Sequence, residues 1–367
     1  MNTTSKNRSP ACDIIRIFAF LSVISVHFFM NSGFYSVPID GARLYLMTVA
    51  RCFFMVCVPL FLILTGYLMC NKKLEKGYYG RITKTLFVYV CASILCILFK
   101  KYYLMQEWGL QDTIEGTLGF TGASYSWYIE MYIGLFLIIP FLNGAYHSLE
   151  SKKQKIILVG TMLCLTALPS VLNIFVFDSF AFWAEPIREW EYTKIVPSFF
   201  TILYPVTYYY LGCFIREFKP KPNKALNALF IIVLAFAFGS FNYYRSRGSI
   251  FVSGIWQEWG ALPNVIMTVL VFIFLLNLPS ERLPSPVKKT LSYISDLTLG
   301  GYLLSYIFDQ YFYGKLNAKV DVVTDRIVYF VPMVAVVAIS SLLLSLAVNL
   351  LYKAMCAILK SKRKTEQ

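Results

Sequence analysis

The sequence has little charge for its length and only two histidines. Asp, Glu, Lys and Arg make up 15% of its 367 residues, whereas a typical soluble domain carries about 25%. With 57% hydrophobic residues and a mean hydropathy of +0.60, the composition excludes an ordinary soluble protein and indicates an integral membrane protein. The net charge of +14 does not indicate nucleic-acid binding, because the basic residues lie in short runs between apolar segments.

Cysteine and histidine spacings that hold metal ions are also lacking. The nine cysteines lie mostly in or beside apolar stretches, which favours buried small side chains over metal ligands or a disulfide framework. We therefore expect no metal. No small-residue cleavage site follows the first apolar stretch, so we expect that stretch to be a retained helix and not a signal peptide.

Apolar stretches of about the length that crosses a bilayer recur along the whole chain. They predict an all-α, polytopic membrane protein with about ten transmembrane helices. We divide it into a cytoplasmic segment over 1–11, one membrane domain over 12–351 and a basic cytoplasmic tail over 352–367. In the long second span, Pro59 and Gly66 are expected to break or kink the helix. The ten predicted spans are 12–31, 44–70, 82–99, 127–144, 156–177, 195–215, 225–242, 261–279, 291–313 and 327–351.

Loop charges predict the orientation of these spans. With a cytoplasmic N-terminus, most loop lysines and arginines lie on the cytoplasmic side, as membrane proteins prefer. An even number of spans then places both termini in the cytoplasm, and we expect a multi-pass protein of the bacterial inner membrane. The opposite loops and boundaries hold acidic residues and tryptophans, namely Glu107, Asp112, Glu115, Glu185, Glu189, Glu191, Trp127, Trp183, Trp190, Trp256 and Trp259.

Two ionisable residues in the first span, Arg16 and His27, are the strongest functional signal. Ionisable groups inside a membrane helix are costly and are usually functional. Their spacing returns to within about 20° of the same helix face, roughly 16 Å further along the axis. A stripe from Arg16 to His27 is therefore expected to line a passage between the two membrane surfaces.

A second group of charges is predicted at the cytoplasmic end of the spans. Arg16 lies beside Asp13, and Arg81 and Lys84 open the third span three residues apart. Guanidinium forks and lysine point charges suit phosphate groups, so these residues form a candidate cationic mouth. The alternative is that the cations only extend to lipid headgroups.

A third group is predicted towards the outer side, where His27, Arg51 and Glu130 fall at similar depth. A neutral imidazole beside a carboxylate can act as a general base, and Glu130 is the predicted carboxylate. Arg51 is predicted to hold this polar cluster together. The alternative is a structural ion pair with a satisfied histidine. Asp296 has no clear partner in the sequence.

These residues belong to motifs through which the chain resembles the membrane-bound acyltransferase-3 family. Arg16 to His27 is similar to its signature of arginine, ten residues and histidine, with the histidine catalytic and the arginine essential in that family. The resemblance implies ten membrane helices, cytoplasmic acyl-CoA as donor and an acceptor often on the outer side. Further similar segments are Val58–Leu68 with Thr65 for the common serine, Arg81–Lys84, Ser126–Glu130, and Thr298–Leu304 followed by Ser305 in place of a histidine.

The sequence as a whole favours an integral membrane O-acyltransferase. We expect acetyl transfer from acetyl-CoA, a co-substrate, to a hydroxyl of a cell-surface glycan, a lipid-linked sugar or a small molecule. His27, Arg16 and Glu130 are the candidate catalytic residues, Arg81 and Lys84 the candidate donor contacts, and Arg51 and Asp13 the supporting cluster. The alternatives are a secondary transporter with a proton relay through His27, Arg51 and Glu130, or a non-enzymatic subunit of a polysaccharide export system.

Overall fold

The computed structural model describes residues 9–176 and 193–365. Over these ranges the chain is almost entirely helical and has no named strand, with a single isolated bridge between Ile39 and Arg247. The all-α prediction is confirmed. The predicted outer-side residues Trp183, Glu185, Glu189, Trp190 and Glu191 lie outside the described residues.

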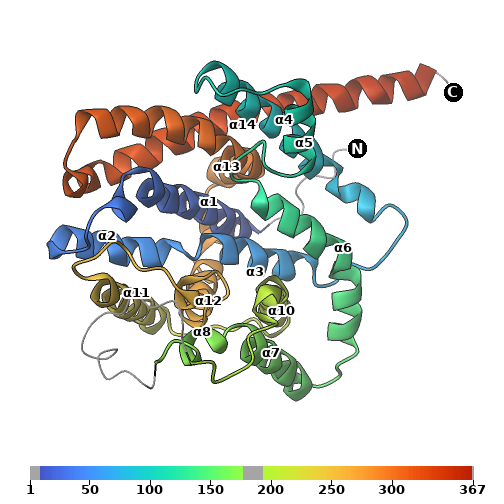
Figure 1. The fold of residues 1–367 in the computed structure, drawn as a ribbon. Helices are drawn as coiled ribbons and strands as arrows, with labels where there is room; N and C mark the ends of the chain where they lie inside the picture. Colours follow the sequence, from blue (N-terminus) through green and yellow to red (C-terminus); the bar gives the residue numbers. More distant parts are fainter. Residues whose placement is uncertain (1–8, 177–192, 366–367) are drawn as a thin grey trace.

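Each predicted span coincides with one helix or with two consecutive helices. The last helix continues well past the predicted end of its span, so much of the predicted tail is helical and projects from the body (Figure 1). The described helices are α1 (Pro10–Asn31), α2 (Gly41–Phe54), α3 (Cys57–Met69), α4 (Thr83–Tyr102), α5 (Leu110–Leu118), α6 (Trp127–His147), α7 (Lys152–Thr166), α8 (Pro169–Leu172), α10 (Tyr204–Phe218), α11 (Lys224–Ser246), α12 (Leu262–Leu276), α13 (Ser285–Lys319) and α14 (Phe330–Thr365).

The predicted break in the second span separates α2 from α3, at Met55 and Val56. Pro59 explains this position. A proline has no N–H to donate to the carbonyl four residues earlier, which is that of Met55, and its ring clashes with that carbonyl. The helix therefore stops before Met55 and restarts at Cys57, with Pro59 in its first turn.

Within the described residues, seven segments are long and apolar enough to cross a membrane. The three predicted spans outside this set correspond to α7, α10 and α13. Helices α7 and α10 have 15 residues each, about 22 Å, which is shorter than a hydrocarbon core of about 30 Å. Helix α13 is long but carries polar residues that face protein. The chain is a polytopic helical membrane protein, and the count of ten stays a prediction.

Helix α1 is the centre of the fold. It packs against α13, α3, α14 and α2, and most of its side chains are buried. In Figure 1 it lies between the α13–α14 pair on one side and α2 and α3 on the other, and the N-terminal end of α1 and the C-terminal end of α14 lie towards the same side of the molecule. The buried positions of α1 and α13 can hold polar side chains away from lipid.

Glycines allow a close contact between α3 and α10. A Cβ on Gly66 would lie 2.0 Å from the backbone oxygen of Tyr209, and one on Gly212 would lie 2.2 Å from that of Ile63. The helix that approaches closely at Gly66 is α10. Helix α10 therefore packs against the side of α3 that faces away from the cavity described next.

Candidate active site

Helices α1 and α13 run side by side, and two of the polar contacts between them involve candidate site residues. Near their N-terminal ends, Arg16 Nη1 donates to the Ser295 hydroxyl at 3.0 Å. Towards their C-terminal ends, His27 Nδ1 lies 3.1 Å from Asp309 Oδ2. The two helices are therefore parallel, and the two contacts lie roughly 16 Å apart along α1.

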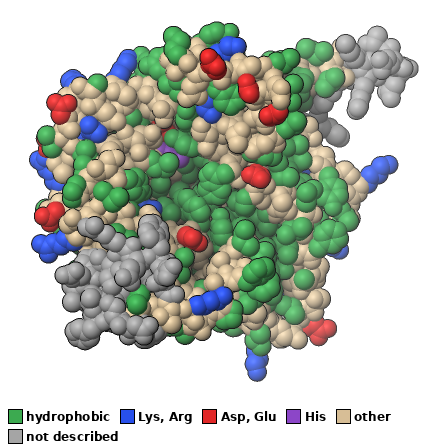
Figure 2. All heavy atoms as spheres, in the orientation of Figure 1, with side chains coloured by type: hydrophobic (Ala, Val, Ile, Leu, Met, Phe, Trp, Pro, Cys, Tyr) green, Lys and Arg blue, Asp and Glu red, His purple; other side chains and the backbone are tan. Residues whose placement is uncertain are grey.

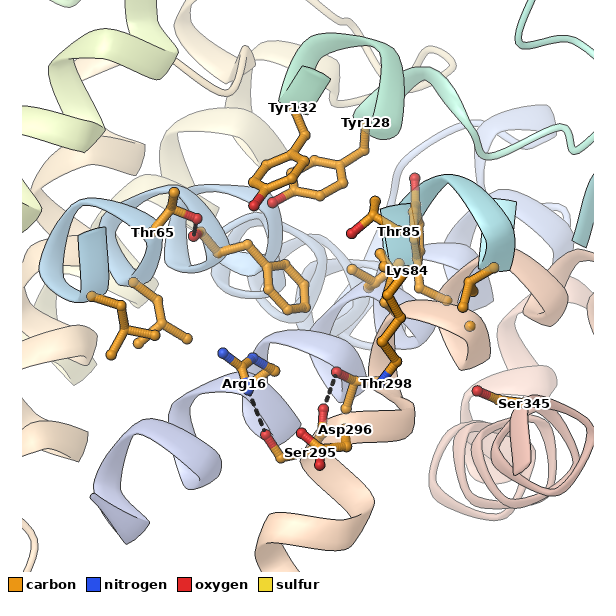
Figure 3. Close-up of a pocket in the computed structure, with 18 of the residues that line it drawn as sticks. Arg16, Thr65, Lys84, Thr85, Tyr128, Tyr132, Ser295, Asp296, Thr298 and Ser345 are labelled. Atoms are coloured by element: carbon orange, nitrogen blue, oxygen red, sulfur yellow. Dashed lines mark hydrogen bonds between the residues drawn. The ribbon is translucent and has the colours of Figure 1, made fainter. Parts of the chain in front are cut away.

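A cavity of about 290 Å³ opens beside the first contact. Figure 3 shows Arg16 and Lys84 extending into it from two sides, with the hydroxyls of Tyr128 and Tyr132 facing it from α6. Apolar side chains form much of the remaining wall. Its other lining residues include Val23, Val58, Phe61, Leu64, Thr65, Val88, Asp296, Thr298, Tyr302, Ser345 and Asn349.

Two of the three cations predicted to form the cationic mouth meet at this cavity, and the third does not. Arg81 does not line it. Its Nη2 lies 3.7 Å from Glu75 Oε2, and its guanidinium lies over the Tyr78 ring. The prediction placed Arg81 and Lys84 on one helix face, but Arg81 belongs to a 3₁₀ turn over Tyr79–Ile82, before α4 begins at Thr83.

Arg16 is held by polar groups of both helices. Besides Ser295, its Nη1 lies 4.0 Å from Oδ1 of Asp13, whose side chain is buried. Arg16 itself is half-buried and stays accessible from the cavity. An arginine with a buried carboxylate behind it keeps its orientation, while part of its guanidinium faces the space in front.

The second contact, between His27 and Asp309, is deeply buried. His27 is 7% exposed and Asp309 is 0% exposed. Tyr125 closes the site: its hydroxyl donates to Asp309 Oδ2 at 2.9 Å, and its ring lies on the imidazole with centroids 3.8 Å apart. The Nδ1–Oδ2 distance fits an ion pair, although the ring is turned out of hydrogen-bond alignment.

This arrangement assigns the two imidazole nitrogens different surroundings. Nδ1 faces the carboxylate at 3.1 Å without an aligned hydrogen bond, and Nε2 lies on the opposite edge of the ring from Nδ1. A carboxylate that accepts from Nδ1–H would fix the tautomer that leaves Nε2 as the acceptor, and it would stabilise the imidazolium that forms when Nε2 takes a proton. The pair is therefore suited to general-base catalysis at Nε2.

The carboxylate beside His27 differs from the predicted one. Glu130 is exposed in the first turn of α6, and no contact joins it to His27 in the described residues. Arg51 is also elsewhere: its Nε donates to the Tyr35 hydroxyl at 3.0 Å, and its guanidinium lies over Phe251. Similar depth on separate helices did not bring His27, Arg51 and Glu130 together. His27 faces Asp309, Arg51 contacts Tyr35 and Phe251, and Glu130 is exposed.

Asp309 and Tyr125 were therefore missed by the sequence reasoning. The signal for Asp309 was present, since it is an acidic residue within a predicted span, the same criterion that selected His27. It lies one turn beyond Ser305, whose buried hydroxyl donates to the backbone oxygen of Tyr302 at 2.8 Å. Tyr125 carries no comparable signal, because it lies in a short loop before α6.

One tyrosine, Tyr302, connects the cavity to the buried His27–Asp309 pair. Tyr302 lines the cavity, and its hydroxyl donates to the backbone oxygen of Tyr125. On α1, Val23 lines the cavity one turn before His27. Figure 2 shows one face of the molecule hollowed over α1, with apolar side chains lining the hollow and histidine at its edge. No group of three or more His, Cys, Asp or Glu residues in the described chain is arranged to hold a metal ion.

An all-helical membrane protein with a cation-flanked cavity and a buried His–Asp pair on the same two helices has the parts of a membrane transferase. The comparisons define the class further. The sequence profile of the acyltransferase-3 family, described as an acyltransferase domain, matches residues 10–348. The chain belongs to this family and is a membrane acyltransferase. No curated protein and no solved structure matches the chain.

Proposed function

We propose that this protein transfers an acyl group, acetyl in the simplest case, from cytoplasmic acyl-CoA to a hydroxyl of an acceptor at the opposite face of a bacterial inner membrane. The acceptor is a surface glycan, a lipid-linked sugar or a small molecule. One observation carries the proposal: the cation-flanked cavity and the His27–Asp309 pair lie at successive depths on the same two parallel helices.

The cavity supports the donor half of the proposal. Arg16 and Lys84 would contact the phosphates of CoA, for which guanidinium and ammonium groups are suited. The acyl-pantetheine arm would then extend along α1, past Val23 and Tyr302, towards His27. The apolar walls of the cavity fit the methylene groups of this arm, and the hydroxyls of Tyr128 and Tyr132 can donate to its amides.

The His27–Asp309 pair supports the chemical step. Nε2 of His27 would take the proton of the acceptor hydroxyl as the oxygen attacks the thioester carbonyl. The C–S bond then breaks, the ester forms, and the CoA thiolate receives the proton from the imidazolium. Asp309 stays ionised throughout and stabilises the imidazolium.

The test uses the full-length protein, purified in detergent, with acetyl-CoA as donor. Surface-polysaccharide and membrane-lipid fractions of the host cells serve as acceptors, and free CoA and acetylated product are measured together. His27→Gln should lower turnover by about 10²–10⁴-fold, the contribution of a positioned general base, while acetyl-CoA binding persists.

The other histidine provides a matched control. His147 is exposed at the end of α6, and its Nε2 lies 2.7 Å from the backbone oxygen of Cys70. His147→Gln should keep nearly full turnover. A monodisperse His27→Gln protein with normal turnover would remove His27 from the mechanism, and wild-type protein that releases no CoA with any acceptor fraction would favour the transporter alternative.

A further inference from the structure

Tyr125 contacts every part of the proposed chemical site. It lies in the loop before α6 and is 9% exposed. Its hydroxyl donates to Asp309, its ring covers the His27 imidazole, and its backbone oxygen accepts from Tyr302 in the cavity wall. A tyrosine held at three points in this way has a fixed position relative to the reacting groups.

The hydrogen bond from Tyr125 falls on the oxygen that faces His27. Oδ2 of Asp309 lies 2.9 Å from the Tyr125 hydroxyl and 3.1 Å from His27 Nδ1. Oδ1 of Asp309 is buried and has no hydrogen-bond partner in the described chain. Among the described residues the Tyr125 hydroxyl makes the one aligned hydrogen bond to this carboxylate, beside the ionic contact from His27 Nδ1. A buried carboxylate that loses such a donor takes up a proton more readily.

The ring of Tyr125 acts on the imidazole itself. Its plane is inclined by 34° to that of His27, at a centroid distance of 3.8 Å. This contact restricts rotation of the imidazole, which decides whether Nδ1 faces Asp309. The hydroxyl and the ring thus have separable effects, one on the charge of the carboxylate and one on the plane of the base.

We propose that Tyr125 is a positioning residue for acyl transfer, which keeps Asp309 ionised at Nδ1 of His27 and holds the imidazole plane. It acts through these two residues and takes no part in the bonds that form and break or in the proton transfer. The inference rests on the proposed function, because it assigns Tyr125 to the same chemical site.

The chain offers a variant pair that separates this role from ordinary packing. Tyr125→Phe removes the hydroxyl and keeps the ring on His27. Tyr313→Phe makes the same change one turn beyond Asp309, where the Tyr313 hydroxyl is buried without a hydrogen-bond partner in the described chain. The titratable groups around the pair are His27 from α1, Tyr125 from the loop and Tyr313 from α13, with Tyr306 beside Tyr125.

The first measurement is kcat against pH for the full-length protein, with acetyl-CoA and an acceptor fraction that the wild type acetylates. Without the Tyr125 hydroxyl, Asp309 is more easily protonated, and the active form needs both an ionised Asp309 and a neutral His27. Tyr125→Phe should therefore move the acidic limb up by about one pH unit and lower kcat about tenfold at pH values below that limb. The KM for acetyl-CoA should stay unchanged, and Tyr313→Phe should match the wild type.

An unshifted acidic limb in Tyr125→Phe, or equal shifts in both variants, would overturn the inference while leaving the proposed function intact. If the wild-type protein shows no acetyl transfer to any acceptor fraction, that result would instead count against the proposed function. A second measurement does not need turnover: the ¹⁵N resonances of the His27 ring, recorded in a His147→Gln background at pH 7, should shift in Tyr125→Phe and not in Tyr313→Phe. Unchanged resonances in both variants would also overturn the inference.

Discussion

The contact between His27 and Asp309 gives a sharp prediction, because the sequence alone favoured a different carboxylate. Asp309→Asn keeps the shape of the side chain and removes its charge. Asp309 is fully buried 3.1 Å from His27 Nδ1, so the change removes an ionic partner from a buried site. Glu130→Gln makes the same chemical change at an exposed position.

The magnitude follows from the kind of contact that is lost. A buried hydrogen bond to a charged group contributes about 1.5–3 kcal/mol. If this stabilisation is felt only when the imidazolium forms, it corresponds to about 10- to 150-fold in kcat, since about 1.4 kcal/mol is tenfold. Asp309→Asn should thus lose less activity than His27→Gln, and Glu130→Gln should stay within about twofold of the wild type.

The assay is steady-state acetyl transfer by monodisperse, detergent-purified variants, with kcat and the KM for acetyl-CoA determined separately. Asp309→Asn should lower kcat and leave KM nearly constant, because the residue does not line the donor cavity. Normal turnover by folded Asp309→Asn protein would refute the assignment. A larger loss in Glu130→Gln than in Asp309→Asn would show that the carboxylate predicted from the sequence is the functional one.

Three further predictions concern the donor, the helix packing and the orientation. Lys84→Ala should raise the KM for acetyl-CoA about tenfold with little change in kcat, whereas Arg81→Ala should alter neither, as steady-state kinetics will show. Gly66→Ala should lower the melting temperature, because its Cβ would clash with Tyr209, and Gly134→Ala, which meets open space, should not; thermal unfolding in detergent decides this. A C-terminal epitope should resist protease in intact spheroplasts and be cleaved in lysed ones, and cleavage in both would reverse the predicted orientation.

The general architecture was predictable because it depends on local sequence properties. Hydropathy and length located the helices, and Pro59 gave the break between α2 and α3. The approach of Arg16 and Lys84 to one cavity followed from the positive-inside pattern, which places both at the same membrane depth. These inferences needed only the position of each residue along its own helix.

The partner of His27 was not predictable in the same way. Asp309 is 282 residues away along the chain, and its contact depends on which helix packs beside α1 and how that helix is rotated about its axis. The depth of a residue in the membrane can be estimated from the sequence, but the rotation of its helix cannot. Glu130, at a predicted depth similar to that of His27, is exposed. Arg81 was misplaced for a related reason, because α4 begins only after it.

The two contacts between α1 and α13 also limit how the chain can change in length. Between Ser295 and Asp309, α13 makes nearly four turns, so both residues lie within about 40° of one face. One inserted residue would rotate Asp309 by about 100° and carry it away from His27, and seven would restore the angle to within about 20° but move it roughly 10 Å along the axis. The spacing between Ser295 and Asp309 is therefore constrained in addition to the identities of the residues that make the two contacts.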